Sequence, residues 1–314
     1  MLRELRQCLP ADGTARIGDV RVGIVDVGAN TVRLLVAARD GERLVAVREE
    51  RVQLGLGEQI EQTGRISEKK LEETAATAAT SVQRARKLRC SAVEVLVTSP
   101  GRQAENGREL VSRLVDVTAA PTRVLSAQEE GALAWRGAVS SARRLPSSVA
   151  VCDVGGGSAQ IGVGTLAEGP SWIRSVDIGS LRLTRRAFRE DPPSASDIQR
   201  AYDAIAEAFD DVAPPHPLAA LAVGGTARAL RRIAGEQLST DAIDAAVEEL
   251  RKRPSRQLAK AYKLDRQRAR TITAGALILA EIQRRLNVPF EVGRGGVREG
   301  AALQLLEATV AATG

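Results

Sequence analysis

The chain has 314 residues, of which 45 are lysine or arginine and 39 are aspartate or glutamate, so its formal net charge is +6 at pH 7. Hydrophobic residues make up 44% of the sequence and charged residues 27%, which excludes a mainly disordered or collagen-like chain. The length exceeds that of one ordinary domain and favours two domains or one large α/β unit.

No apolar run approaches the roughly 18 residues that a membrane span requires, and the first 20 residues carry charges in place of a secretory signal. We therefore expect a cytoplasmic protein without a membrane partner. Cys8, Cys90 and Cys152 are odd in number and widely spaced, which argues against a disulfide framework or a cysteine zinc site. Aromatic residues amount to only 2%, too few to stack nucleic-acid bases, so no nucleic-acid partner is expected.

The first half of the chain begins with an apolar run that ends in a tight turn at Gly28, which is typical of a buried strand. An Asp-Gly pair at 40–41 then predicts a hairpin between the next two strands. The expected order is βββαβα, with strands at 22–27, 31–38, 43–54 and 93–97 and helices at 67–89 and 105–115.

The second half repeats this opening and then becomes mainly helical. A polar, proline-rich stretch at 191–196 separates its strands from the helices. Strands are expected at 122–125, 148–154, 161–163 and 172–178, with a last strand ending at 223, and helices at 130–144, from 198 onward, and at 227–233, 268–286 and 297–309.

The repeat itself is the most informative feature of the sequence. An apolar strand, Asp-Val-Gly and a hydroxyl residue occur at 23–31 and again at 149–158, which places Asp153 127 residues after Asp26. A strand that ends this way presents backbone N–H groups to an anion, and its carboxylate can hold Mg2+. One such turn usually only closes a hairpin. Two copies favour a cleft in which Asp26 and Asp153 converge from the two halves.

Two further segments carry candidate chemistry. Ser126 and Glu129 fit a capping box, whereas Glu130 is not needed for the cap and can order a water molecule against phosphorus, so it is the candidate base. Taken alone, such an acidic pair more often complements the helix dipole. The turn at 224–226 opens a helix, where it either closes the strand-to-helix connection or contacts an anion.

These residues resemble the exopolyphosphatase and guanosine pentaphosphate phosphatase family, within the sugar kinase, heat-shock chaperone and actin superfamily. The resemblance covers most of the chain and rests on six ordered motifs at 26–34, 98–106, 126–130, 153–160, 224–226 and 297–300. It implies an α/β fold of duplicated RNase H-like (actin-like) lobes with a cleft between them. It also implies Mg2+-dependent release of terminal phosphate from inorganic polyphosphate or guanosine pentaphosphate.

The resemblance further implies lobe boundaries and site residues. The first lobe would span 21–125 and the second, with helical insertions, 126–314; a helix at 297–314 would pack back on the first lobe, and 1–20 would be an N-terminal extension. Glu130 would be catalytic, and Asp26 and Asp153 would hold Mg2+. The phosphate would be bound by Gly28, Ala29, Asn30, Thr31, Arg33, Arg102, Gly155, Gly156, Gly157, Ser158, Gly224, Gly225 and Thr226. A homodimer is compatible with this short, two-lobe form.

Position 160 departs from the family pattern, because Gln160 stands where the family usually has Glu. A neutral amide ligates a hard cation less strongly than a carboxylate and accepts no proton from water. The sequence therefore leaves two hypotheses open: a polyphosphate hydrolase, and a catalytically weak phosphate or nucleotide sensor. A kinase of the same superfamily is disfavoured, because Glu130 and Arg102 match the phosphatase branch.

Basic residues gather in three clusters that either extend an anion track beyond the cleft or form ordinary solvated surface. The single histidine, His216, lies between two prolines and receives no catalytic role. The clusters are Arg182, Arg185 and Arg186; Arg228, Arg231 and Arg232; and Arg251, Lys252, Arg253 and Arg256.

Overall fold

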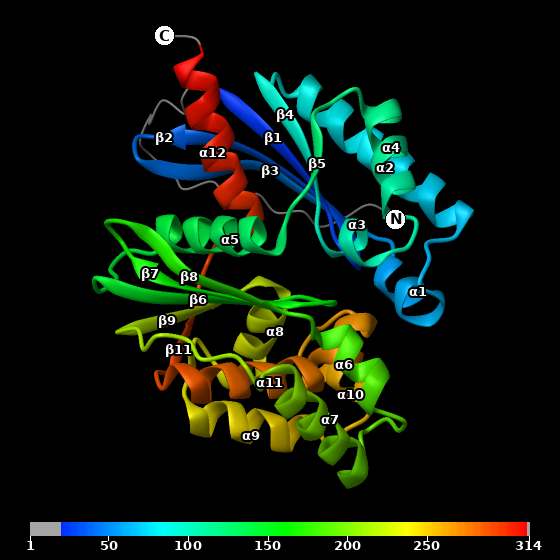
Figure 1. Cartoon of the computed structure of the whole chain (residues 1–314), viewed down its shortest axis with the longest axis vertical. Coiled ribbons are helices and arrows are strands. Elements are labelled where there is room, and N and C mark those ends of the chain that lie inside the picture. The colour runs from blue at the N-terminus through cyan, green and yellow to red at the C-terminus, as the bar shows by residue number, and fades with distance from the viewer. Residues whose placement is uncertain (1–19, 313–314) are drawn as a thin grey trace.

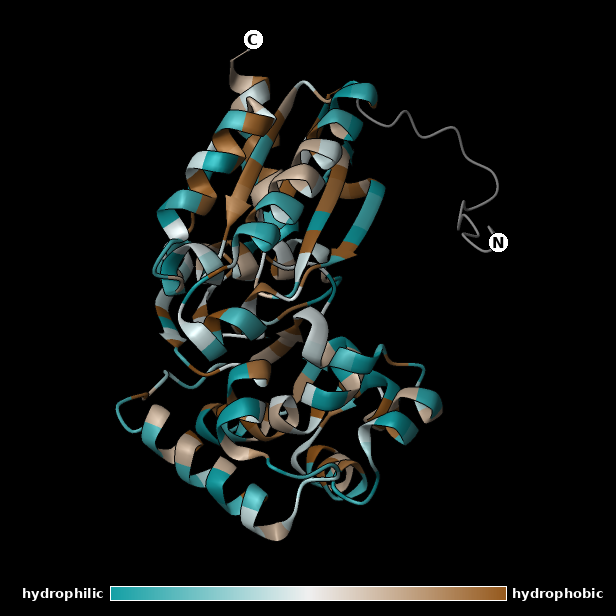
Figure 2. Ribbon diagram, turned by 90° about the vertical axis from the view of Figure 1, so that its right-hand side faces the viewer, coloured by the Kyte–Doolittle hydropathy of each residue, from teal (hydrophilic) through white to brown (hydrophobic). Residues whose placement is uncertain are grey.

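The computed structural model describes residues 20–312, so the expected N-terminal extension lies, apart from Val20, outside the described residues. The chain forms two α/β lobes, each built on its own mixed sheet (Figure 1). In Figure 2 the central strands of the first lobe are mainly hydrophobic, and the surrounding helices turn hydrophilic residues outward. None of the described helices is long and apolar enough to cross a membrane.

The first lobe contains a five-stranded sheet of order β3-β2-β1-β4-β5. The first three strands form an antiparallel meander, and β4 and β5 continue the sheet in parallel with β1. The strands are β1 (Arg21–Val27), β2 (Thr31–Asp40), β3 (Arg43–Gln53), β4 (Ala92–Val97) and β5 (Thr122–Val124). The helices are α1 (Leu56–Thr63), α2 (Glu68–Lys87), α3 (Ser99–Gln103) and α4 (Gly107–Thr118).

β1 reads as a nearly continuous apolar run because both of its faces are covered. Val25 and Val27 pack in one hydrophobic cluster with residues of α2 and α4. Val22 and Ile24 pack on the opposite face in a cluster with residues of α12 (Val297–Ala311). Since side chains alternate along a strand, Asp26 shares the face that α12 covers.

The second lobe contains a six-stranded sheet of order β10-β11-β9-β6-β7-β8. Its strands are β6 (Ser148–Val154), β7 (Ala159–Thr165), β8 (Gly169–Val176), β9 (Ala219–Val223), β10 (Gln237–Leu238) and β11 (Phe290–Val292). Its helices are α6 (Ser180–Ala187), α7 (Ala195–Ala208), α8 (Gly224–Ala234), α9 (Thr240–Leu250), α10 (Ser255–Ala261) and α11 (Arg266–Leu286).

The two sheets share one topology. The order β8-β7-β6-β9-β11 repeats β3-β2-β1-β4-β5, with the same antiparallel meander and the same two parallel neighbours. The predicted α/β fold with duplicated lobes is therefore confirmed. The expectation that the strand ending at 223 is the last one is wrong, because β11 extends the sheet beside β9. At three residues, β11 is too short for a recognisable alternation.

The helices that close the two lobes pack on each other's sheets. Trp135 and Ala138 of α5 (Ala127–Ser141) join a cluster with Val149 and Val151 of β6. Helix α12 contacts β1 and β2 and lies against α5, which Figure 1 shows between the two sheets. The first turns of α5 and α12 therefore reach the junction between the lobes.

Candidate active site

The two glycine turns of the repeat have the same backbone geometry. The N–H group of Gly28 donates to the carbonyl of Thr31 at 2.9 Å, and that of Gly155 donates to the carbonyl of Ser158 at 2.9 Å. Each turn thus folds back at the carboxyl end of its strand, β1 or β6. The sequence repeat is a structural repeat at the atomic level.

The first turn of a helix forms a backbone hydrogen bond to each glycine turn. The carbonyl of Ala29 accepts an N–H from the first turn of α1 at 2.6 Å, and the carbonyl of Gly156 accepts one from the first turn of α6 at 3.0 Å. Among the described residues, the N–H groups of Ala29, Asn30, Gly156 and Gly157 form no recorded hydrogen bond, and all four residues line one cavity. Grouped free N–H donors of this kind bind anions.

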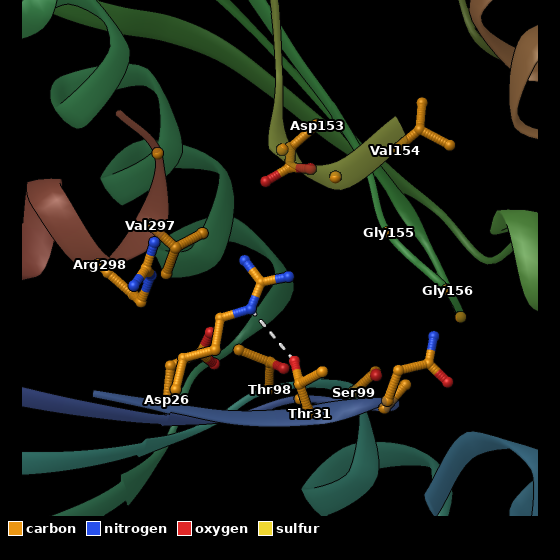
Figure 3. A pocket seen from close by; sticks show the side chains of 18 of the residues that line it. Asp26, Thr31, Thr98, Ser99, Asp153, Val154, Gly155, Gly156, Val297 and Arg298 are labelled. Atoms are coloured by element: carbon orange, nitrogen blue, oxygen red, sulfur yellow. Dashed lines mark hydrogen bonds between the residues drawn. The ribbon is translucent and has the colours of Figure 1, made fainter. Parts of the chain in front are cut away.

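That cavity lies between the lobes and has a volume of about 140 Å³. Figure 3 shows Asp26 of β1 and Thr31 of β2 on the side of the first lobe, with Asp153 approaching from the opposite side. The first turns of α5 and α12 complete its wall. The sequence-predicted residues that line it are Asp26, Gly28, Ala29, Asn30, Thr31, Arg33, Glu130, Asp153, Gly155, Gly156, Gly157, Ser158, Gly224 and Gly225.

Asp26 and Asp153 are half-buried carboxylates that line the cavity. Burial is the main cause that raises the pKa of each, and the arginines around the cavity oppose this effect. The Oδ1 atom of Asp26 is buried and has no hydrogen-bond partner among the described residues. A buried carboxylate oxygen without a donor has the chemistry of a cation ligand.

Glu130 reaches the cavity from the first turn of α5. Its Oε2 atom accepts a hydrogen bond from Nη2 of Arg102 at 2.8 Å. Burial raises the pKa of Glu130 to about 7, against the lowering effect of the Arg102 charge. A pKa in this range is the one that suits a general base at neutral pH.

Glu129, its neighbour, caps the helix as predicted. Its Oε2 accepts the backbone N–H of Ser126 at 2.8 Å, and its own N–H donates to the Ser126 hydroxyl at 3.1 Å. The hydrogen bond from the Ser126 backbone lowers the pKa of Glu129. The two adjacent acids thus differ in environment, one at the helix cap and one in the cavity.

The profile of the Ppx/GppA phosphatase family matches residues 35–309 of this chain. The chain belongs to the Ppx/GppA phosphatase family. Exopolyphosphatase 2 of Mycobacterium tuberculosis is 27% identical over 317 residues, covering 91% of this chain and 98% of the relative. Exopolyphosphatase 1 of Mycobacterium leprae is 24% identical, covering 92% of this chain and 90% of the relative.

Solved structures of the Ppx/GppA family share the fold. The Aquifex aeolicus family member has a TM-score of 0.79 at 24% identity and covers 94% of this chain and 99% of its own. An exopolyphosphatase from Cytophaga hutchinsonii has a TM-score of 0.82 at 20% identity, covering 92% of this chain and 98% of its own. The duplicated lobes therefore match the family's fold along nearly the whole chain.

Three of the predicted Ppx/GppA site residues do not line the cavity. Thr226 is fully buried and donates from Oγ1 to the carbonyl of Val154 at 2.7 Å. Arg102 points its guanidinium at Glu130 and at the carbonyl of Leu125, to which Nη1 donates at 2.7 Å. In this structure Thr226 supports the second glycine turn, and Arg102 binds Glu130 and does not line the anion site.

Replacing Arg102 with Gln tests this placement. The positive charge of Arg102 lowers the pKa of Glu130, so the loss of this charge should raise that pKa. A higher pH is then needed to form the Glu130 carboxylate. We expect the acid limb of the kcat profile, near pH 7 in the wild type, to move to higher pH. A rise in KM with an unchanged pH profile would instead place Arg102 on the substrate.

Gln160 is the third residue outside the cavity lining. It lies opposite Asp153 in the β6–β7 register and is buried, with Nε2 donating to the hydroxyls of Ser158 at 2.8 Å and Ser175 at 3.2 Å. Ser158 lines the cavity, so Gln160 orients a site residue from behind. Gln160 itself does not line the cavity, so in this arrangement it contacts the site through Ser158.

Replacing Gln160 with Glu should therefore act through charge. If position 160 held the metal ion, as the sequence pattern allows, this variant would have a higher turnover and a lower Mg2+ requirement. Position 160 lies close to the start of α5, since Gln160 Cβ is 4.0 Å from a Cβ atom built on Gly131. We therefore expect a carboxylate at 160 to raise the pKa of Glu130 and to move the acid limb of the rate profile to higher pH, while the Mg2+ concentration for half-maximal rate stays within about twofold. Titration of Mg2+ at several pH values separates the two, since a severalfold fall in the Mg2+ requirement would restore the metal-ligand hypothesis.

Several cavity residues were given no role from the sequence. Arg268 donates to Thr226 Oγ1 at 3.1 Å, and Gln267 donates to Asn30 Oδ1 at 2.8 Å, which ties α11 to the first glycine turn. Burial lowers the pKa of Arg33 and of Arg268 to about 10. Thr98, Ser99 and Arg298 also line the cavity, and the motifs at 98–106 and 297–300 that contain them could have identified them as site residues. No local sequence motif contains Arg268 or Gln267.

Proposed function

We propose that this Ppx/GppA family member is a Mg2+-dependent hydrolase that releases terminal phosphate from inorganic polyphosphate. The observation that supports this proposal best is that Glu130, with a pKa of about 7, faces a cavity lined by free N–H groups, arginines and the carboxylates of Asp26 and Asp153. Arg33, Arg228 and Arg268 line that cavity and have no carboxylate partner among the described residues. The relatives named exopolyphosphatase agree with this choice of substrate.

Phosphoryl transfer needs mainly positioning and neutralisation of charge. The free N–H groups of the two glycine turns and the arginines hold the phosphate oxygens. Arg102 occupies Oε2 of Glu130, which leaves Oε1 to accept the proton of the attacking water. Burial of the carboxylate keeps its pKa close to neutrality, so the base is available and strong enough at the same pH.

The acidic residues of the cavity suit Mg2+. Asp26 and Asp153 supply hard oxygen donors, and Oδ1 of Asp26 lacks any other partner. Among residues 20–312 no group of three or more His, Cys, Asp or Glu is arranged to hold a metal, which suits an ion bound by one or two carboxylates and the substrate phosphates. Such an ion would neutralise charge on the phosphates.

One observation favours the alternative of a catalytically weak phosphate sensor. The position paired with Asp153 across β6 and β7 carries the neutral Gln160, where the resemblance to the family leads one to expect a carboxylate. The same free N–H groups and arginines would then bind the anion and release it unchanged. Guanosine pentaphosphate remains the second candidate ligand for either function.

Phosphate release from polyphosphate and from guanosine pentaphosphate, measured side by side with and without Mg2+, tests the proposal. Mg2+-dependent turnover of polyphosphate is the expected result. Tight binding of polyphosphate without turnover would establish the sensor. If neither anion binds, both functions are excluded.

A further inference from the structure

A second cavity adjoins the first on the side where arginines line it. It lies between β3, α8 and the start of α11 and has a volume of about 430 Å³. Arg33, Arg51, Arg228, Arg268 and Arg298 line both cavities. The first cavity alone is smaller than ordinary ligand sites of about 300–1,000 Å³, whereas the second falls within that range.

Positive charge dominates this second cavity. Arg231 and Arg232 of α8 join the five shared arginines, and the acidic lining residues are Glu49, Glu50 and Asp265. Each acid is already engaged: Glu49 with Arg298, Glu50 with Arg48 and Arg84, and Asp265 with Arg51. The acids therefore leave a surplus of cationic donors.

The surplus can be assigned to individual side chains. Arg33, Arg228, Arg232 and Arg268 have no carboxylate partner among the described residues, although Arg232 donates to the carbonyl of Lys263. Arg228, Arg231 and Arg232 lie three and four positions apart on α8, so they share one helix face. A row of guanidinium groups that continues from the phosphate site suits further phosphate groups.

The chemistry of the lining distinguishes a phosphate chain from a nucleoside. No aromatic ring lies among the described lining residues, and the apolar contribution comes from Ala229 and Leu264. A purine base gains most from an aromatic face, whereas successive phosphates gain from successive arginines.

We propose that the second cavity binds the phosphate units of an extended polyphosphate that follow those held in the first cavity. This inference rests on the proposed function and adds a chain-length preference to it. Short anions fill the first cavity only. Long chains gain the contacts of Arg231 and Arg232, which line only the second cavity.

The test compares two matched double variants. Arg231→Gln/Arg232→Gln removes one arginine that pairs with Glu236 and one without a carboxylate partner. Arg253→Gln/Arg256→Gln is the control, because Arg253 pairs with Glu249, Arg256 lacks a carboxylate partner among the described residues, and neither lines a cavity considered above. Both variants change the net charge by the same amount.

We expect the first variant to raise KM for long-chain polyphosphate about tenfold, with kcat unchanged and KM for tripolyphosphate within about twofold. The control should match the wild type for both substrates. An equal rise in KM for long-chain polyphosphate and for tripolyphosphate would refute a role of the second cavity in chain-length preference. A rise in KM for guanosine pentaphosphate, with KM for long-chain polyphosphate unchanged, would indicate that the second cavity binds a nucleoside and would refute the proposal.

Equilibrium binding separates this inference from the proposed function. Long-chain polyphosphate is titrated into wild type and both variants at low and high salt. If the wild type binds it without turnover and the Arg231→Gln/Arg232→Gln variant binds about tenfold more weakly, the subsite stands and the hydrolase proposal falls. If the wild type and both variants bind long chains equally, the subsite is refuted even where turnover is observed. The salt dependence should be steeper in the wild type than in that variant.

Discussion

Replacing Glu130 with Gln should reduce the turnover of phosphate release by about 10² to 10⁴-fold, because a positioned general base contributes that much. The fold should survive. Gln has the same shape, and its amide oxygen can still accept from Arg102. The pKa of about 7 also means that the wild-type cavity already accommodates a neutral group here at neutral pH. Initial rates, substrate affinity and thermal melting would be measured together.

The control for that variant is Glu129→Gln, one residue earlier. Glu129 bonds the Ser126 backbone and pairs with Arg123 outside the cavity, and glutamine also serves in capping boxes. We expect wild-type turnover within about twofold and a stability loss below about 1 kcal/mol, since the ion pair is exposed. If Glu129→Gln lost turnover and Glu130→Gln kept it, the assignment of cap and base would be reversed.

The sequence repeat allowed the topology and much of the site to be predicted. Asp26 and Asp153 are each the last residue but one of a strand that is otherwise mainly apolar, so each was expected near the carboxyl end of a buried strand. Once the same segment occurred twice, two equivalent sheets and a shared cleft followed. Ser126 and Glu129 likewise carried a local hydrogen-bonding pattern that needs no tertiary contact.

The rest of the site depends on contacts that no local pattern records. Arg268 and Gln267 reach the cavity because α11 begins beside the first glycine turn, more than 230 positions away in sequence. The direction of the Arg102 side chain is set by the carbonyl of Leu125 and the carboxylate of Glu130, neither of which its own motif contains. Helices α1 and α6 were missed because eight residues give little periodicity.

Replacing Gly224 with Ala should abolish most turnover by displacing the carboxylate of Asp153. Gly224 has φ of +80°, and a Cβ atom there would lie 2.0 Å from Oδ1 of Asp153 and 2.9 Å from its Cγ. That half-buried carboxylate, beside the second glycine turn, must therefore move. We expect at least a tenfold loss of kcat, roughly the effect of about 1.4 kcal/mol, and a raised Mg2+ concentration for half-maximal rate.

Gly235, at the other end of α8, supplies the control. Its φ is +93°, but a Cβ atom there would meet no atom within 4 Å, so Gly235→Ala introduces backbone strain without displacing a site residue. Both variants place a Cβ atom at a positive φ, which should cost each about 1 to 3 kcal/mol of stability. Only Gly224→Ala should lose turnover and Mg2+ affinity. Equal rates in the two variants, at matched folded fractions, would show that the position of the Asp153 carboxylate does not limit the reaction.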